Sequence, residues 1–415
     1  MSSCVARGLL FTTALIISLG PASEVHGQFD TVINVPPDRF DGTLESNCQL
    51  NLFAGADVQS LTAGPGTNIE VNLLGWNYDY FVTFHAGTTA NLNDGFVNEV
   101  CVHEGAELFV QGGRFFRLFC DGTAYLNTQV NEGLVRVGET AVVEFIGGDV
   151  RTDIDIDGIA SFANGTFGDL TVDVSETGKL VVNEDGFGAA DFNFSIRGEV
   201  ELLGGGIGGD FLTVGPTGVV YQNGGNLSGS DLSIQGYVRT FAGRISSSLT
   251  RVLGVVDFYG GEFNFTFQRL EIENALNVYG GDFNPPSEFQ LQVRSDGDLN
   301  LYGSEFAIDG VLIKGLESGV PFTVKDRGIE LSGIYADGSS FSMPLDFNDS
   351  GNINVTQLIL GDTNRDNSIN LLDVSSFLDA LGGEEYLAEA DTNLDREINM
   401  ADVGVFVDLL LGQTN

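Results

Sequence analysis

Positive charge is scarce in this chain. Its 415 residues include 18 Lys and Arg against 58 Asp and Glu, so the net charge is −40, and lysine occurs only at Lys179, Lys314 and Lys325. Nucleic acids and anionic membranes are bound through clustered positive charge. The composition therefore argues against both partners and favours divalent cations. Because 42% of the residues are hydrophobic, the chain is not a disordered acidic tail, and its length allows more than one folded domain.

Long apolar runs are also lacking beyond the N-terminus. The only such run, from Leu9 to Gly20, follows Arg7 and is too short to span a bilayer comfortably. It is followed by "PASEVHG", with Val25 and Gly27 at the positions that a signal peptidase reads. We therefore expect residues 1–27 to be a signal peptide cleaved after Gly27, and the protein to be secreted, extracellular or at the cell surface, with no membrane span. An uncleaved N-terminal anchor is the alternative.

Residues typical of a catalytic centre are few. Only His85 and His103 follow the expected cleavage site, so no Ser/His/Asp or Cys/His arrangement is evident, and we expect both to lie on strand surfaces. A glycosidase needs two carboxylates at a set separation, and no spacing singles out such a pair. A lyase needs a basic residue beside a metal-bound uronate, but the Lys and Arg residues stand in dissimilar contexts. The sequence therefore assigns no catalytic residue.

A short phrase built around two glycines recurs through the middle of the chain. The clearest copies are FIGGDV at 145, FANGTF at 162, FYGGEF at 258, VYGGDF at 278 and LYGSEF at 301, and weaker copies begin at 109, 202, 222 and 241. Neighbouring copies are spaced by roughly 17 to 23 residues, which is the length of one coil of a β-solenoid. Short alternating apolar and polar runs, broken by Gly, Asn and Asp, predict strands and turns between them.

Aligning the last three clear copies creates three columns of equivalent residues. The columns are Tyr259, Tyr279 and Tyr302; Phe263, Phe283 and Phe306; and Glu262, Asp282 and Glu305. Equivalent residues of successive coils stack about 4.8 Å apart, and stacked aromatic rings bury apolar area and fix the register. We therefore predict a mainly β protein with a parallel β-helix over residues 28–306. An all-β sandwich built from hairpins is the alternative, because period-two patterning does not separate the two.

Cysteine is rare, and the mature chain would keep Cys48, Cys101 and Cys120. The interval between Cys101 and Cys120 is close to the length of one coil. They are therefore a candidate disulfide between adjacent coils, and two separate buried thiols are the alternative.

The segment 307–359 lacks the repeat phrase but contains β-rich runs and a hairpin signal at Asp337-Gly338. An open solenoid end exposes unpaired strand edges that have to be covered. We therefore expect this segment to be a β-rich cap.

Two stretches near the C-terminus, "DTNRDNSINLLD" and "DTNLDREINMAD", repeat one acidic pattern. Oxygen-bearing side chains occupy positions 1, 3, 5, 9 and 12, and a backbone carbonyl would supply position 7, as in a twelve-residue calcium loop. The first loop contains Asp362, Asn364, Asp366, Ser368 (carbonyl), Asn370 and Asp373, and the second contains Asp391, Asn393, Asp395, Glu397 (carbonyl), Asn399 and Asp402. Two Ca²⁺ sites are therefore expected, and an acidic solvated linker is the alternative.

Each loop is followed by a helical run that stops at glycine, at Gly382-Gly383 and at Gly412. With its paired EF-hand-like loops, the segment 360–415 resembles a type I dockerin. The resemblance implies a small α-helical domain that folds around two Ca²⁺ ions and binds a cohesin module. Positions 10 and 11 of the loops would contact that partner, and here they hold Leu371, Leu372, Met400 and Ala401. Position 6, commonly glycine in the family, is Asn367 and Arg396.

The remainder of the chain looks like large exported repeat proteins of planctomycete-type bacteria. The shared features are an "INVPPD"-like start, Gly-Gly repeats, a "DGV…ADGSSF" cap and a dockerin-like tail. This second resemblance implies no particular activity.

The function predicted from these features is structural or adhesive. We expect a secreted, calcium-binding β-solenoid whose dockerin-like module docks it to a cohesin-like or other extracellular protein. The alternative is a carbohydrate-active β-helix, either a hydrolase or a polysaccharide lyase, acting in polysaccharide catabolism. A third reading is a non-catalytic glycan binder that uses Trp76, Tyr78 and Tyr80, which alternation places on one face of a strand. Those rings could equally form a packing surface.

Overall fold

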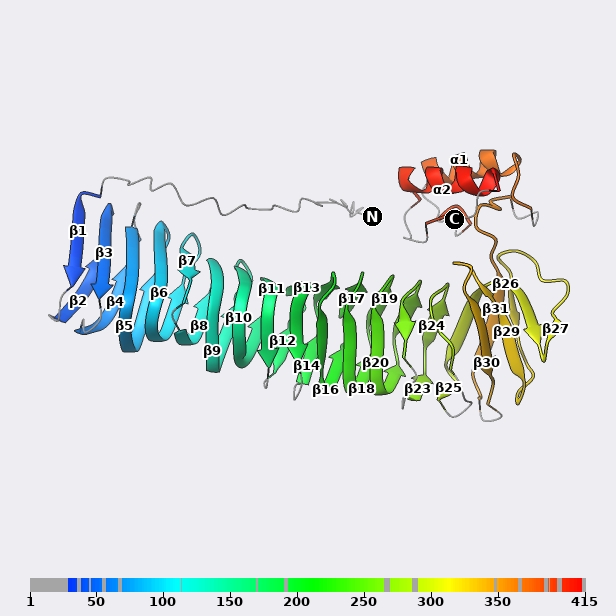
Figure 1. Ribbon diagram of the computed structural model, residues 1–415, viewed down its shortest axis with the longest axis horizontal. Coiled ribbons are helices and arrows are strands. Elements are labelled where there is room, and N and C mark those ends of the chain that lie inside the picture. The colour runs from blue at the N-terminus through cyan, green and yellow to red at the C-terminus, as the bar shows by residue number, and fades with distance from the viewer. Residues whose placement is uncertain are drawn as a thin grey trace, which may run out of the picture.

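The computed structural model shows a long β-solenoid with two short helices at its C-terminal end (Figure 1). It describes residues 29–35, 39–44, 46–53, 57–65, 69–112, 114–168, 171–189, 193–264, 269–285, 290–346, 349–364, 368–383, 387, 389–393 and 398–412. The expected signal peptide, 1–27, lies outside these ranges. The solenoid confirms the parallel β-helix that the repeat phrase predicts, and the sandwich alternative is wrong.

One row of parallel strands runs the length of the solenoid, and each strand pairs with its equivalent on the next coil. This first row contains β1 (Thr31–Val35), β3 (Cys48–Phe53), the starts of β5 (Ile69–Phe84) and β6 (Thr88–Val102), β7 (Glu107–Val110), the starts of β9 (Thr123–Val137), β10 (Val142–Ile156), β11 (Ile159–Gly168) and β13 (Lys179–Ala189), then β15 (Glu199–Leu202), β17 (Val219–Gln222), β19 (Tyr237–Thr240), β21 (Val255–Phe258), β24 (Ala275–Val278), the start of β26 (Asp298–Ile308) and β31 (Asn352–Gln357). Paired residues are one coil apart, as Glu107 and Thr123 are in a short coil and Ala275 and Asp298 in a longer one.

A second row of parallel strands runs beside the first. It contains β2 (Arg39–Leu44), β4 (Asp57–Ala63), the ends of β5 and β6, β8 (Arg114–Cys120), the ends of β9 and β10, β12 (Val172–Val174), β14 (Asn193–Ile196), the ends of β16 (Gly206–Val214), β18 (Asn226–Ile234) and β20 (Arg244–Val252), then β23 (Arg269–Ile272) and β25 (Leu291–Val293). A shorter third row joins the starts of β16, β18 and β20 to β22 (Glu262–Phe263).

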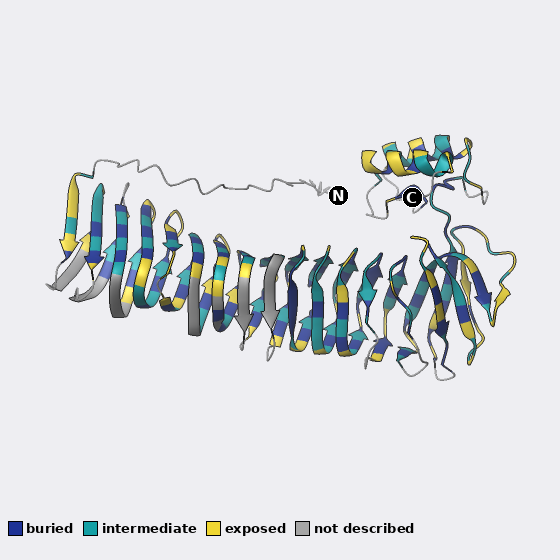
Figure 2. Ribbon diagram, in the orientation of Figure 1, coloured by how far each residue is buried: buried dark blue, intermediate teal, exposed yellow. Residues whose placement is uncertain are grey.

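The core lies inside the coils because alternate residues of each strand point inward. In β15, for example, Val200 and Leu202 are fully buried while Glu199 and Glu201 face outward. The same period-two banding follows the strands in Figure 2. Stacking equal positions on every coil therefore builds one continuous apolar interior.

The tyrosine column predicted from the repeat is present. Tyr259 stacks on Tyr279 with ring centroids 4.5 Å apart, and Tyr279 stacks on Tyr302 at 4.3 Å. Phe241 extends the stack by one more coil, at 5.2 Å from Tyr259. We call these four rings the aromatic stack. The glycine turn behind it needs positive φ, as at Gly261 (φ +92°), where a Cβ would lie 2.4 Å from the carbonyl oxygen of Gly243.

The phenylalanine column and the acidic column predicted from the repeat are present in two coils, but the third residue of each column lies elsewhere. Glu262 forms a parallel bridge with Asp282, and Phe263 packs edge-on against Phe283 at 5.6 Å. Glu305 instead has φ +53° and lies at a register shift where β26 turns to pair with an antiparallel strand. The next residue, Phe306, is buried and packs against Phe341 of the cap, with ring centroids 6.1 Å apart.

The two thiols proposed as a disulfide do not form one. Cys101 and Cys120 are both free. The strand register places Cys120 beside Val102, while Cys101 lies beside Phe119. Because neighbouring residues of a strand point to opposite faces, this offset of a single position sends Cys120 into the core and Cys101 toward the outside.

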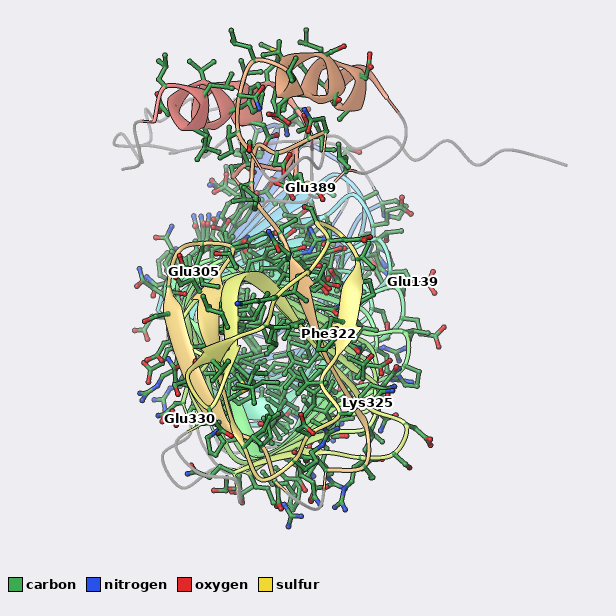
Figure 3. The ribbon with its side chains drawn as sticks, turned by 90° about the vertical axis from the view of Figure 1, so that its right-hand side faces the viewer. Glu139, Glu305, Phe322, Lys325, Glu330 and Glu389 are labelled. Atoms are coloured by element: carbon green, nitrogen blue, oxygen red, sulfur yellow. The ribbon has the colours of Figure 1, made fainter. Side chains whose placement is uncertain are left out.

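The C-terminal end of the solenoid is covered by antiparallel strands: β27 (Val311–Leu312), β28 (Pro321–Thr323), β29 (Glu330–Tyr335) and β30 (Ser340–Pro344). β29 pairs with β26 and forms a hairpin with β30, and β28 pairs with β31. β31 lies in the segment expected to be the cap, but it pairs in parallel with β26 and continues the first row. Figure 3 looks onto this end, with Phe322 in the covering layer and the helices above it.

A short connection leads from β31 to the helices α1 (Asp373–Gly382) and α2 (Met400–Leu410). Leu358 is buried on the aromatic stack, and Leu360 packs against the same cluster. The amide of Gly361 then donates to the carbonyl of Glu389 at 2.7 Å. The connection thus contacts both the solenoid and the segment between the two helices.

Candidate metal centre

The two acidic loops adopt the same geometry around the carboxylate at position 12. In the first loop, Asp373 accepts hydrogen bonds from the amides of Asn364 at 3.0 Å and Asn370 at 2.8 Å. Those donors are positions 3 and 9 of the loop. Each oxygen of Asp373 therefore holds a different side of the loop in place.

The second loop repeats this arrangement. Asp402 accepts from the amides of Asn393 at 3.2 Å and Asn399 at 2.9 Å, again positions 3 and 9. The hydroxyl of Thr392 donates to the carbonyl of Asp402 at 2.9 Å, just as Thr363 donates to that of Asp373 at 2.6 Å. The sequence repeat is thus also a repeat of hydrogen bonds.

Each helix begins at its loop. Asn399 caps α2 by accepting from the amide of Ala401, and Asp402 completes a capping box. At α1, the side chain of Asn370 accepts from the amide of Leu372 at 2.9 Å. Asp373 and Asp402 both lie in a first helical turn, where the helix dipole favours negative charge.

The carboxylates at positions 1 and 12 are withdrawn from water. Asp362, Asp373, Asp391 and Asp402 each have no exposed surface. Ionised carboxylates in a protein interior are paired, strongly hydrogen-bonded or bound to metal, because burying a charge without compensation is costly. Four such groups in so short a segment are therefore an unusual concentration of buried acid.

The other predicted ligands are placed only in part. Asn364, Asn370 and Asn399 are half-buried, and Asn393 and Ser368 are exposed. Asp366, Asp395 and Glu397 lie outside the described residues. Among the described residues, which omit 365–367 and 394–397 in the middle of the loops, no group of three or more His, Cys, Asp or Glu side chains is arranged to hold a metal. The described donors are all hard oxygens, which suit Ca²⁺.

A small apolar core joins the two loop–helix units. Phe377 of α1 and Phe406 of α2 are buried and stack in parallel, with centroids 4.0 Å apart and planes 1° apart. These two rings occupy equivalent positions in the two units. Ile398, the apolar residue at position 8 of the second loop, packs against this core. The two units therefore contribute equivalent aromatic residues to one shared core.

Several apolar side chains on these helices and just before them face solvent instead. Leu371 is 81% exposed, Leu372 70% and Met400 74%, and Ala401 beside Met400 is also exposed. These are the four residues that the sequence singles out as partner contacts. Further exposed residues, not singled out by the sequence, are Leu378, Val407 and Leu411. Spacing would have found the last two, because Met400, Val407 and Leu411 share one face of α2.

The candidate glycan contacts lie in β5. The strand register places Trp76 beside Gly95 and Tyr78 beside Val97. The side chains of Trp76, Tyr78 and Tyr80 lie outside the description. Their role as glycan contacts therefore stays a prediction.

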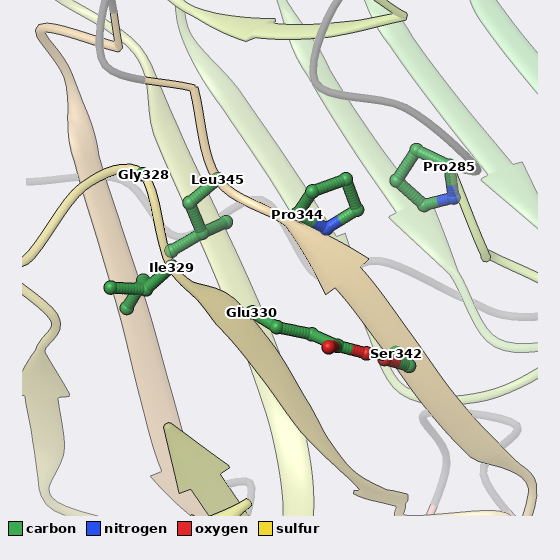
Figure 4. Close-up of a pocket in the computed structure, with 7 residues that line it drawn as sticks. All are labelled: Pro285, Gly328, Ile329, Glu330, Ser342, Pro344 and Leu345. Carbon is green, nitrogen blue, oxygen red and sulfur yellow. Dashed lines mark hydrogen bonds between the residues drawn. The ribbon is translucent and has the colours of Figure 1, made fainter. Parts of the chain in front are cut away.

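A cleft of about 400 Å³ lies in the cap (Figure 4). It is lined by Pro285, Gly328, Ile329, Glu330, Ser342, Pro344 and Leu345. Glu330 is its single carboxylate, and it is engaged by the hydroxyl of Ser342. The cleft thus lacks the carboxylate pair of a glycosidase.

His85 and His103 stack on each other at 4.5 Å on the outside of neighbouring coils.

No protein-family description, curated protein or solved structure matches this chain. Neither α1 nor α2, the two helices in the described ranges, is long and apolar enough to cross a membrane. Inferences about function therefore depend on the geometry of the chain itself.

Proposed function

We propose that residues 360–415 form a dockerin-like, calcium-dependent docking module on a secreted structural or adhesive rod. The observation that carries the proposal is the twofold repeat of one loop geometry. In each loop, buried aspartates at positions 1 and 12 flank a run of oxygen-bearing residues, and the position-12 carboxylate accepts from the amides at positions 3 and 9. Two acidic segments without a shared role would not be expected to bury the same positions and to form the same hydrogen bonds at those positions.

Calcium would supply the positive charge that these loops lack. Asp362, Asp366 and Asp373 would hold one ion together with Asn364, Asn370 and the carbonyl of Ser368. The equivalent residues of the second loop would hold the second ion. Without a cation the clustered carboxylates repel one another, so ion binding and folding of the module are coupled.

The exposed apolar residues on the helices give the module its docking surface. Leu371, Leu372 and Met400 are exposed residues at positions 10 and 11 of the loops, so the ion-bound loops would hold them in place. Burying such residues against a partner protein would contribute about 25 cal/mol for each Å² of apolar surface removed from water. A cohesin-like or other extracellular protein with an apolar face is the partner class proposed.

Calorimetric titration of the full, chelator-treated chain tests the metal sites. We expect two Ca²⁺ per chain for the native sequence and one for Asp373→Asn or Asp402→Asn. Asp379→Asn is the matched control, because Asp379 is an exposed carboxylate of α1 outside the loops. Hydrogen exchange of residues 360–412 should quicken when EDTA is added, while exchange in the solenoid stays unchanged. No calcium uptake, or equal loss in the control, would refute the sites.

Binding to a panel of isolated cohesin modules tests the docking surface. We expect calcium-dependent binding that Leu371→Glu with Leu372→Glu weakens at least tenfold, since two apolar contacts would be replaced by charge. Leu203→Glu, an exposed leucine on the solenoid, is the control and should bind normally. If the chain takes up calcium but binds no cohesin, the module docks to another class of protein.

A further inference from the structure

The N-terminal end of the solenoid, unlike the C-terminal end, has a strand edge that no described residue covers. Among the described residues, β1 pairs only with β3, and β2 pairs only with β4. The other edge of β1 therefore presents backbone groups with no neighbouring strand in the described part of the chain. At the opposite end, β28 and β29 cover β31 and β26.

The burial of equivalent residues also differs between the two ends of the solenoid. Ile33 occupies the inward column of the first row, where Leu50 and Val71 on the next two coils have no exposed surface. Ile33 is nevertheless only half-buried. In the last strand of the row, Ile353 is fully buried beneath the cap. The first coil is thus less buried than the last one, as expected for an end without a covering layer in the described part of the chain.

Within β1 the sequence has none of the usual protections against strand pairing, and charge and proline stand only beside the strand, at Asp30 and Pro36. Thr31–Val35 reads TVINV, which is uncharged, mostly β-branched and free of proline. Natural edge strands are usually blunted by charge, proline or a bulge. The edge strand of the cap follows that rule, since β28 begins with Pro321. In a chain with a net charge of −40, β1 is one of the places where two copies could meet without strong repulsion.

We propose that two copies of the mature chain join end to end through the free edges of their β1 strands, paired antiparallel about a twofold axis at Ile33. Thr31 donates its amide to Asn47, so the amides of Val32 and Asn34 point to the free edge. About this axis Val32 of one copy lies opposite Asn34 of the other. Inward residues then meet inward residues, and the two cores become continuous.

A second copy fits this edge better than the chain's own N-terminal residues. Cleavage after Gly27, as the sequence predicts, leaves Gln28 as the only residue before the described Phe29. A single residue is too short to add a covering strand, because strands usually have about three residues or more. The inference rests on that cleavage and does not depend on the docking function.

Sedimentation of the chain 28–415 over a range of concentrations tests the inference. We expect a dimer whose maximum dimension in small-angle scattering is nearly twice that of the monomer. Val32→Pro should abolish it, because proline removes an edge-facing amide that the monomer does not use. Val32→Ala keeps that amide and is the matched control. Val32→Lys is a second disrupting variant if the proline variant is unstable.

The outcomes separate this edge from the helical module. A monomer at all concentrations would overturn the inference, and so would a compact dimer. Dimers that persist in both disrupting variants but disappear with EDTA would place the contact on the calcium module instead. Loss of dimer in Val32→Pro and Val32→Lys, with unchanged melting and calcium uptake, is the supporting result.

Discussion

Side chains on successive coils behave as neighbours although they are far apart in sequence. The side-chain amide of Asn51 donates to Asn34 at 2.8 Å, that of Asn72 donates to Asn51 at 2.9 Å, and that of Asn91 donates to Asn72 at 3.1 Å. Each residue inside such a ladder has one partner above and one below. A substitution therefore affects two other coils, and its cost depends on whether it faces the core or the solvent.

Phe283 tests which side of the strand faces the core. It is fully buried against Phe258 and Phe263, so Phe283→Ala should cost about 3–5 kcal/mol of unfolding free energy by leaving a cavity. Its neighbour Asp282 is exposed and accepts from Asn284 at 2.8 Å. Asp282→Asn should change stability by about 0.5 kcal/mol or less. Denaturant unfolding of both variants measures this, and the reverse ranking would contradict the register.

The stacked histidines predict a pH dependence. Burial, and then the neighbouring His103, lower the pKa of His85 from its ordinary value of 6.5. A histidine whose pKa is lower in the folded state binds its proton more readily when unfolded, so stability falls as the pH drops through 6.5. Once the pH is below the folded pKa as well, the loss stops growing.

Melting temperatures at pH 7.5 and pH 5.5 check this effect. His103→Asn removes the like charge while keeping a polar residue, so it should lose less stability on acidification than the native chain. The difference between the two proteins isolates the histidine pair from the many carboxylates. An identical loss in both would show that the pair does not couple.

At the scale of elements, the cap is held by a few polar anchors. The buried carboxylate of Asp349 accepts from the amides of Val293 at 2.8 Å and Asp346 at 3.1 Å. Arg327 donates to the carbonyls of Val324 at 2.7 Å and Gly351 at 2.8 Å. These bonds tie the cap to the last coils, where a strand edge would otherwise be open.

Removing the Asp349 anchor should loosen the cap. Asp349→Ala leaves two amides without their acceptor, which typically costs about 1–3 kcal/mol. Asp326→Ala, an exposed carboxylate of the same segment, should be nearly neutral. Hydrogen exchange should quicken in β29–β31 before it does so in earlier coils. Uniform quickening along the whole solenoid would show that the cap does not open on its own.

Local sequence predicts much of this architecture and misses what depends on exact register. The repeat phrase identified the coils and the tyrosine column because both follow from one period. It failed at Glu305, where the bulge depends on β29, a strand formed from residues outside the repeat. It also failed for Cys101 and Cys120, because coil length varies from coil to coil, and a shift by a single position reverses the face.

The candidate metal site was likewise predicted in part from the sequence. Spacing predicted both acidic loops, and the resemblance to a dockerin pointed to Leu371, Leu372 and Met400, which the structure leaves exposed. It could not predict that Asp362 and Asp391 would lose all contact with water, because that burial depends on how the two halves pack. The parallel contact between the phenylalanines of α1 and α2 likewise depends on how the two helices pack against each other.

At the scale of the whole molecule, several of the positively charged residues in the described part of the chain bridge coils. Arg197 pairs with Asp173 at 2.7 Å, and Arg251 pairs with Asp231 at 2.6 Å, each across about one coil. The excess carboxylates give the rod a strongly negative surface, which makes copies repel one another side by side. An uncharged end such as β1 is therefore a more favourable place for contact than the flanks.

The packing of Leu358 and Leu360 on the aromatic stack has a mechanical consequence. Ladder hydrogen bonds run between coils, so tension on a bare last coil would peel the strands off one at a time. The connection to the helices instead leaves β31 across Tyr302, Tyr279 and Tyr259. A pull on the two helices would first load these rings in shear, sharing the force among several coils before β31 could separate.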